Sequence, residues 1–351
     1  MINLLNTKNN MKKISIILAS LAGLLMLTTA CNDEWKDEQY EHYISFKAPL
    51  NDDGVSAIYV PYTRKTADGQ GQEGISSYQL PIIVSGTTSN SSDITVNIGK
   101  SDTLAILNYE QFQNRTDLYY NELPENFATY PATHTIKSGE DVSLYKIDFN
   151  FKGIDMSQKW VLPLEIKSGN GYAAHPRKHY AKALLRVYPF NDYSGKYSAT
   201  TQKMGRTGED DKAAGGESTR AYVVDDKTVF FYAGNNIDES RIDRHLYKIY
   251  AEFIPDPGED GKAGTVRFYD PTNNPDLGFS SSDALFSINE VADEIQPYII
   301  HRYITISGID YYFNDYTHDA NGVRDYHVQG AVTMERKINT QIPDEDMAIE
   351  W

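Results

Sequence analysis

Residues 247–254 read YKIYAEFI, and their alternation sets the fold class. Apolar side chains occupy every second position from Tyr247 to Phe253, while Lys248 and Glu252 lie between them. Successive side chains of a β-strand point to opposite faces of its sheet, so this spacing predicts a strand with one buried and one solvated face.

Similar strand-like runs recur in both directions from this stretch. Before residue 190 they cover residues 43–46, 78–85, 94–98, 145–151, 160–167 and 181–188, and after it residues 196–203, 221–233, 265–269, 298–307, 309–316 and 326–338. Clusters of Gly, Asn, Asp and Ser separate the runs, and no window of a dozen residues carries a clear helical stripe. The sequence therefore predicts an all-β protein.

The length and the turn-forming residues indicate two domains. Residues 189–195 (PFNDYSG) interrupt the strand pattern, and the roughly 320 residues that follow residue 30 are more than one core usually holds. We predict an immunoglobulin-like β-sandwich over residues 51–189 and a second antiparallel β-barrel or β-sandwich domain over residues 190–351. Its closing hairpin is expected to turn at residues 319–322 (DANG). Residues 118–127 are expected to form a short helical or irregular excursion, and residues 205–219 a loop.

Residues 1–30 have the layout of a secretory signal. Lys12 and Lys13 precede an apolar segment at residues 14–27, and small residues follow as far as Ala30. This segment is shorter than the roughly 20 residues of a membrane-spanning helix, so a permanent span is the weaker alternative. Residues 27–31 (LTTAC) resemble a lipobox, which makes Cys31, the only cysteine, the predicted lipid anchor.

The excess of acidic residues limits the classes of partner that the protein can have. Residues 31–50 are predicted to form a lipid-anchored tether, whose acidic run NDEWKDE resembles the export signal of outer-membrane surface lipoproteins. Removal of residues 1–30 takes away three lysines and no acidic residue, which changes the formal net charge from -16 to -19. Such a surface repels nucleic acid and anionic headgroups, so no nucleic acid is expected and membrane contact is through the anchor alone. Neutral oligosaccharides or polysaccharides are favoured over anionic ones for the same reason.

The chain resembles Bacteroidetes surface lipoproteins from polysaccharide-utilisation loci. The amino-terminal marks are IIVSGT at 82–87, ITV at 94–96, YYNELP at 119–124, IKSG at 136–139 and WVLPLEI at 160–166, and the carboxy-terminal mark is FNDYSGKY at 190–197. The first set is similar to a domain of unknown function in these lipoproteins, and the second to the start of the β domain that commonly follows it. The resemblance implies a cell-surface glycan-binding lipoprotein that works beside an importer pair of the SusC and SusD kind.

Residues 311–316 (YYFNDY) are the candidate glycan-binding stretch of the sequence. In a strand, Tyr312, Asn314 and Tyr316 share one face, while Tyr311 and Phe313 share the other. Aromatic rings stack on sugar rings and amides bond hydroxyls, so Tyr312, Asn314 and Tyr316 form a candidate carbohydrate platform. Tyrosine also favours sheets for packing alone. Trp351 is a further candidate contact.

No catalytic motif is recognised, and we expect no enzyme and no cofactor. The family-18 glycosidases that carry the same amino-terminal domain need an acidic run that this chain lacks, although a carboxylate pair hidden among the loops remains an alternative. Asp310, Asp315, Asp319 and Asp325 are interpreted as solvated loop residues. Residues 256–261 (DPGEDG) have oxygen donors suited to calcium, but lack the pattern of an EF-hand loop, so a plain turn is favoured. A structural or adhesion lipoprotein without a sugar ligand is the other alternative.

Overall fold

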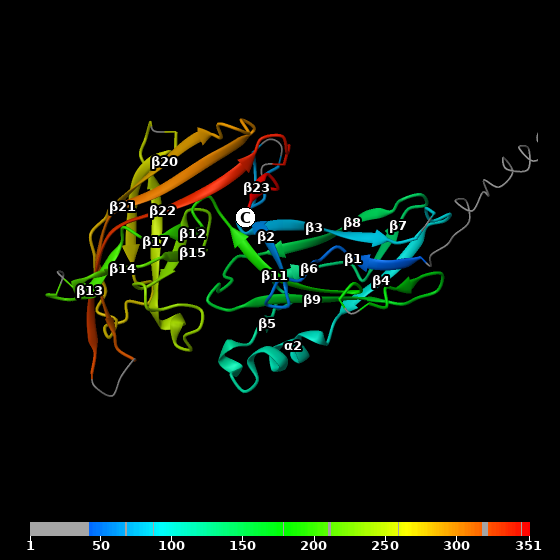
Figure 1. Cartoon of the computed structure of the whole chain (residues 1–351), viewed down its shortest axis with the longest axis horizontal. Helices are drawn as coiled ribbons and strands as arrows, with labels where there is room; N and C mark the ends of the chain where they lie inside the picture. Colours follow the sequence, from blue (N-terminus) through cyan, green and yellow to red (C-terminus); the bar gives the residue numbers. More distant parts are fainter. Residues whose placement is uncertain are drawn as a thin grey trace, which may run out of the picture.

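The computed structural model describes residues 42–351, apart from residues 67–68, 87, 178, 210–211, 259, 318–321 and 345. The predicted signal peptide, Cys31, most of the predicted tether and the turn at 319–322 lie outside the described residues. Two β-rich domains lie end to end along the long axis of the molecule (Figure 1). Within the described residues, no helix is both long and apolar enough to cross a membrane.

The first domain is a β-sandwich with one α-helix. Its strands are β1 (Tyr43–Phe46), β2 (Ser56–Pro61), β3 (Ile75–Val84), β4 (Ile94–Lys100), β5 (Asn121–Glu122), β6 (Ala128–Thr129), β7 (Thr133–Ile136), β8 (Val142–Asn150), β9 (Trp160–Lys167), β10 (Ala173–Ala174) and β11 (Lys182–Phe190). The helices are α2 (Thr103–Phe112) and the short 3-10 helix η2 (Thr116–Leu118).

The two sheets of the sandwich pack face to face. One has the strand order β10-β1-β3-β8-β6, and the other has the order β2-β11-β9-β4-β7, with β5 paired to β9. Alternate residues of both sheets fill the space between them, including the fully buried Leu80, Ile82, Val96, Leu164 and Leu185. This arrangement confirms the predicted sandwich.

Two sequence predictions for this domain need correction. The tether was expected to reach residue 50, but β1 begins at Tyr43 and pairs with β3. The helix α2 at residues 103–112 was not predicted, whereas residues 118–127, expected to form a short helical or irregular excursion, are mostly irregular and contain only the end of η2 and the two-residue strand β5. Leu104 and Asn108 are the buried positions of this 10-residue helix, which is too short to show a stripe over a dozen residues.

The second domain is built from the remaining strands. They are β12 (Gly195–Ser198), β13 (Lys203–Arg206), β14 (Ala214–Gly215), β15 (Ser218–Val223), β16 (Thr228–Tyr232), β17 (Lys248–Pro255), β18 (Ala263–Tyr269), β19 (Ser280–Ser281), β20 (Ala284–Ala292), β21 (Ile299–Asp315), β22 (Arg324–Asn339) and β23 (Ile349–Glu350), with the 3-10 helix η4 (Arg244–Tyr247) before β17.

Eight of these strands close into an antiparallel barrel. Each of β12, β15, β16, β17, β18, β20, β21 and β22 pairs with the next, and β22 pairs back with β12, so the ring has no free edge. On β17, Ile249, Ala251 and Phe253 are buried inside, as the alternation predicts. Of the two predicted architectures, the barrel is therefore confirmed. The expected loop at residues 205–219 is present in part: the described residues between β13 and β14 lie outside strands, but β14 and the start of β15 fall within the predicted range, and β13 and β14 extend the sheet beside β22.

A β-bulge in β21 determines which tyrosines face outward. The pairing with β22 shifts between Ser307 and Ile309, and the intervening Gly308 has a φ of 72°. Ile304 and Ile306 are buried before the bulge, whereas the odd-numbered Ile309, Tyr311 and Phe313 are buried after it. Because the extra residue reverses the inside and outside positions, Tyr312 lies on the outer surface of the barrel.

Ion pairs and a hydrogen bond join the two domains. Arg186 Nη2 of β11 lies 3.0 Å from Glu239 Oε2, and Lys248 Nζ of β17 lies 3.1 Å from Asp155 Oδ2. Arg244 Nε donates to the Ser157 carbonyl over 3.1 Å. Arg186 is only 7% exposed, so the junction is a packed interface and not a free hinge.

Candidate functional site

The predicted platform is present in part on the outer face of the barrel. Tyr312 is 40% exposed, and its ring stacks on the ring of His327 with the centroids 4.2 Å apart and the planes at 4°. The two residues are direct partners across β21 and β22. On the other side, Tyr312 pairs with the small, exposed Ser280 of β19. His327 therefore supports one face of the Tyr312 ring. Ser280, the partner of Tyr312 on the other neighbouring strand, has only a small side chain.

Hydrogen-bonding groups surround this ring. Asp310, which shares the outer face, has its Oδ1 2.9 Å from His327 Nε2, so it fixes the imidazole beneath the tyrosine. Asn314 is half-buried, and its Nδ2 donates to the Asp276 carbonyl over 3.3 Å. The aromatic ring can stack on a sugar, and the neighbouring carboxylate and amide oxygens can accept hydrogen bonds from the sugar hydroxyls. We call Tyr312, His327, Asp310, Asn314 and Ser280 the barrel platform.

Tyr316 does not extend the barrel platform. Strand β21 ends at Asp315, and the half-buried ring of Tyr316 lies against Tyr247, with centroids 5.4 Å apart. Its hydroxyl accepts a hydrogen bond from Asn274 Nδ2 over 2.8 Å, and burial raises its pKa above the usual value. The neighbouring Asp315 is a further correction: it is 1% exposed, not a solvated loop residue, because Arg241 donates to both of its oxygens over 2.7 and 2.9 Å.

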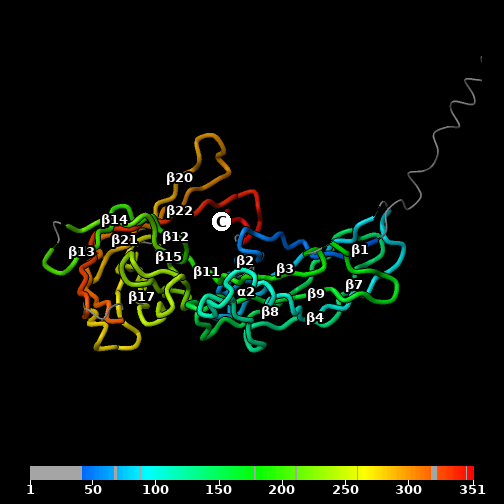
Figure 2. Tube along the Cα trace, turned by 60° about the horizontal axis from the view of Figure 1, so that its bottom comes forward, coloured from blue at the N-terminus to red at the C-terminus, as the bar shows by residue number. Residues whose placement is uncertain are grey.

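Trp351 lies far from the barrel platform, between the two domains. It is 49% exposed and stacks on Tyr59 of β2, with the centroids 4.1 Å apart and the planes at 3°. Tyr59 in turn stacks on Tyr188 of β11 at 5.4 Å, and Phe190 meets the indole edge-on at 4.8 Å. The C-terminus lies between the domains in Figures 1 and 2. Sequence reasoning found Trp351 but not its partners, which come from strands more than 160 residues away in the chain.

A groove lies at this junction. We call it the junction groove and define it by its principal side chains: Tyr59, Tyr188, Phe190, Arg220, Tyr222 and Trp351. The sandwich supplies the first three, whereas the barrel domain and its tail supply the others. Burial raises the pKa of Tyr188 well above its usual value, so its hydroxyl stays protonated in the physiological range.

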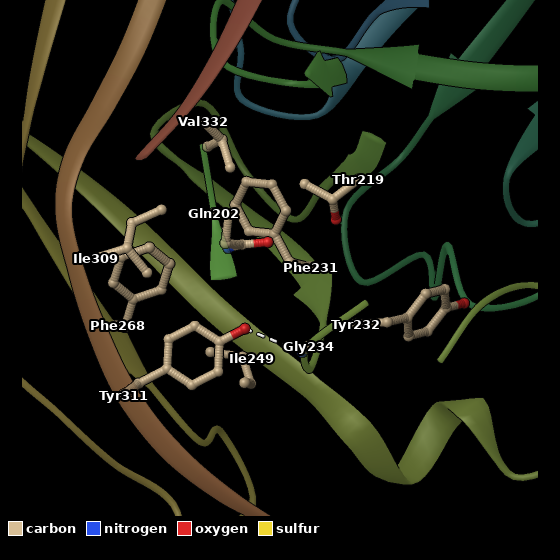
Figure 3. Close-up of a pocket in the computed structure, with 10 residues that line it drawn as sticks. All are labelled: Gln202, Thr219, Phe231, Tyr232, Gly234, Ile249, Phe268, Ile309, Tyr311 and Val332. Atoms are coloured by element: carbon tan, nitrogen blue, oxygen red, sulfur yellow. Dashed lines mark hydrogen bonds between the residues drawn. The ribbon is translucent and has the colours of Figure 1, made fainter. Parts of the chain in front are cut away.

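The inside of the barrel holds a further, small cavity (Figure 3). Most of its wall is apolar, with Phe231, Ile249 and Phe268 among the lining side chains. The hydroxyl of Tyr311 points into it but accepts a hydrogen bond from the Gly234 N–H over 3.0 Å. Burial raises the pKa of Tyr311 to about 12. A sugar buried here would leave most of its hydroxyls without partners, so the two outer surfaces are better suited to glycan.

The candidate calcium loop connects β17 and β18 as a turn. Asp256 N–H donates to the Ala263 carbonyl over 2.9 Å, which closes the hairpin. Among the residues that the structure describes, no group of three or more His, Cys, Asp or Glu side chains is placed to hold a metal ion. Glu259 of this loop lies outside the described residues.

Comparisons with known proteins identify relatives for both domains. A family model described as a domain of unknown function (DUF4973) matches residues 35–170, and a second, described only as a carboxy-terminal domain, matches residues 181–333. No curated protein matches the chain.

Several solved structures match nearly the whole chain. An auxiliary nutrient binding protein from Bacteroides thetaiotaomicron is 44% identical, with a TM-score of 0.78 over 89% of this chain and 100% of that one. A multidomain protein including DUF1735 from Bacteroides ovatus is 39% identical, with a TM-score of 0.75 over 88% and 100% of the two chains. A protein of unknown function from Bacteroides ovatus is 35% identical, with a TM-score of 0.73 over 90% and 97%. The chain therefore belongs to the family of two-domain Bacteroides proteins that these structures represent.

Proposed function

We propose that this protein is a lipid-anchored, surface-exposed lipoprotein of the outer membrane that binds neutral glycan and passes it to an importer of the SusC and SusD kind. It performs no catalysis and needs no cofactor. The signal layout and Cys31 support the anchor, and the 44% identical relative described as an auxiliary nutrient binding protein supports a role in nutrient capture.

The exposed Tyr312 ring carries the binding part of this proposal. The ring of Tyr312 stacks on His327 on one side, and its partner on the other strand is Ser280, whose side chain is small. The stack with His327 and the bond from His327 to Asp310 hold the ring in place before any ligand arrives. A ring that is already fixed loses little conformational entropy when a sugar stacks on it.

Affinity electrophoresis across a panel of neutral polysaccharides tests the platform. The wild-type protein is expected to be retarded by at least one member, and Tyr312→Ala to weaken that affinity about tenfold, the loss of one aromatic contact. Tyr109→Ala is the matched control, because Tyr109 is 66% exposed on α2 of the other domain. Equal losses in the two variants, or no retardation of the wild type, would refute the proposed site.

Three further measurements test the lipid anchor, the surface exposure and the absence of catalysis. Labelled palmitate should enter the wild-type protein in cells and not Cys31→Ser, and protease added to intact cells should cleave the wild type. Product analysis after incubation with the glycan panel should find no released sugar. Sustained release would favour the alternative of a glycoside hydrolase, in which a pair of carboxylates acts as acid and base.

A further inference from the structure

The junction groove combines an aromatic surface with unpaired positive charge. Trp351, Tyr59 and Tyr188 form a continuous column of stacked rings, with neighbouring planes at 3° and 18°. The indole at its outer end is about half exposed, so part of the column is accessible from solvent. Such a column offers the stacking surface that a sugar ring needs.

Arg220 supplies the charge at the other end of the column. Its guanidinium carbon lies 4.7 Å from the ring centre of Tyr188 and 5.9 Å from that of Tyr222. Arg220 is half-buried, and no carboxylate of the described residues forms an ion pair with it. The adjacent Arg186 differs, because Glu239 neutralises it at 3.0 Å.

A second arginine adds to the positive potential of the groove. Arg336 is 4% exposed, and its guanidinium carbon lies 5.3 Å from the ring centre of Trp351. Its Nη2 donates only to the backbone carbonyls of Asn191 and Ser194, over 3.0 and 2.8 Å. Asp192 is near enough to act on its charge but makes no ion pair with it. The junction groove is therefore bordered by two arginines that form no ion pair with a described carboxylate, although the chain as a whole carries a formal net charge of -16.

We infer that the junction groove binds an acidic glycan, in which the carboxylate of one sugar residue is held by Arg220 and the ring of a neighbouring sugar residue packs against Trp351. The planar guanidinium fork matches a carboxylate with two parallel hydrogen bonds, and its stacking on Tyr188 keeps the fork oriented. This inference rests on the proposed glycan-binding function and extends it from neutral sugars to acidic ones.

The test uses three acidic polysaccharides, each beside a neutral form of the same backbone. Polygalacturonate, hyaluronate and polysialate are compared with their carboxyl-reduced counterparts by affinity electrophoresis of the mature chain. At least one acidic form is expected to bind about tenfold more tightly than its reduced form, and Arg220→Met to abolish that preference. Methionine retains the length and the ring contact of arginine but not the charge.

Arg206→Met is the matched control. It removes the same charge from the exposed β13, where Arg206 makes no ion pair with a described residue, and it should leave the preference intact. Arg220→Lys keeps the charge without the fork and should lose part of the preference, and thermal unfolding of all variants verifies that they are folded. A wild-type protein that prefers none of the three acidic forms, or an Arg206→Met variant that behaves as Arg220→Met, would overturn the inference.

Dextran sulfate beside dextran separates the two sources of negative charge. Suppose that dextran sulfate binds in a manner that depends on Arg220, while no carboxylated polysaccharide is preferred over its reduced form. The ligand would then be a sulfated sugar, and the inference of a bound carboxylate would be overturned. Retardation by neutral glycans separates this test from that of the proposed function. If Arg220→Met still binds neutral glycans and the wild type does not prefer acidic ones, only the inference about the junction groove is refuted.

Discussion

The barrel platform and the junction groove are both aromatic surfaces, but they are built in different ways. The barrel platform comes mainly from two adjacent strands, and Tyr312, Asp310 and Asn314 lie within five consecutive residues of one of them. The junction groove draws on both domains and on the last residue, Trp351. A single strand can place side chains of one kind on one face, whereas a groove between domains combines aromatic and charged groups that are remote in sequence.

The two surfaces also differ in charge. The barrel platform contains Asp310 and no cationic side chain that lacks a carboxylate partner, which suits the hydroxyls of a neutral sugar. The junction groove contains Arg220, which favours an anionic one. The net charge of a protein therefore describes its average surface and does not determine the potential of an individual site.

The largest expected effect is a difference in the free energy of unfolding between substitutions at two neighbouring residues, one inside the barrel and one outside it. Phe313 is fully buried, and Phe313→Ala should lower the free energy of unfolding by about 4 kcal/mol, since it leaves a cavity in the core. Tyr312→Ala should cost less than about 1 kcal/mol, because this ring lies on the surface. Denaturant unfolding of both variants measures the difference.

Similar costs at the two positions would show that the bulge at Gly308 does not set the register as described. Ser307→Ala, an exposed position beside the bulge, is the control and should change the free energy of unfolding by less than about 0.5 kcal/mol.

A smaller effect is expected at the junction, and it depends on pH. Burial by itself raises the pKa of Glu239. Its interactions with Arg186 and Tyr222 together outweigh burial and hold that pKa below the usual value. A carboxylate with a lowered folded-state pKa stabilises the fold above its unfolded pKa of about 4.3, and this contribution disappears as the pH falls through the folded pKa. Glu239→Gln should therefore cost about 2 kcal/mol at pH 7 and almost nothing at the most acidic pH at which the protein folds.

Thermal unfolding of wild type and Glu239→Gln between pH 7 and pH 3 measures this change. Asp148→Asn is the control, because the Lys146–Asp148 pair is more than half exposed on both sides and should contribute little at any pH. A difference between wild type and Glu239→Gln that stays constant with pH would contradict the assigned role of the carboxylate.

The smallest expected effect is the coupling between the two surfaces. For a glycan that contains both neutral and acidic sugars, Tyr312→Ala and Arg220→Met should each weaken binding. If the surfaces act separately, the losses in binding free energy should add in the double variant to within about 0.5 kcal/mol. Titration calorimetry on the wild type, both single variants and the double variant measures the coupling. A larger coupling would mean that the two surfaces respond to each other through the barrel.

Local patterns predicted the class of fold and part of one candidate site. The alternation at residues 247–254 correctly assigned the inner face of β17, because strand periodicity depends only on adjacent residues. The same rule placed Tyr312 and Asn314 opposite Tyr311 and Phe313. It failed for Tyr316 because the strand ends at Asp315, where an ion pair with Arg241 buries the carboxylate. That ion pair joins residues 74 positions apart, which no local pattern reveals.

Composition and short-range spacing were enough to predict an all-β protein with two domains and a cluster of aromatic residues near residue 312. The closure of the second domain into a barrel, the reversal of the faces of β21 at Gly308 and the groove that Arg220, Tyr188 and Trp351 share are visible only in the folded chain. These features depend on pairing and packing between distant segments. Many chain arrangements satisfy the same local pattern, and only the packed structure selects one of them.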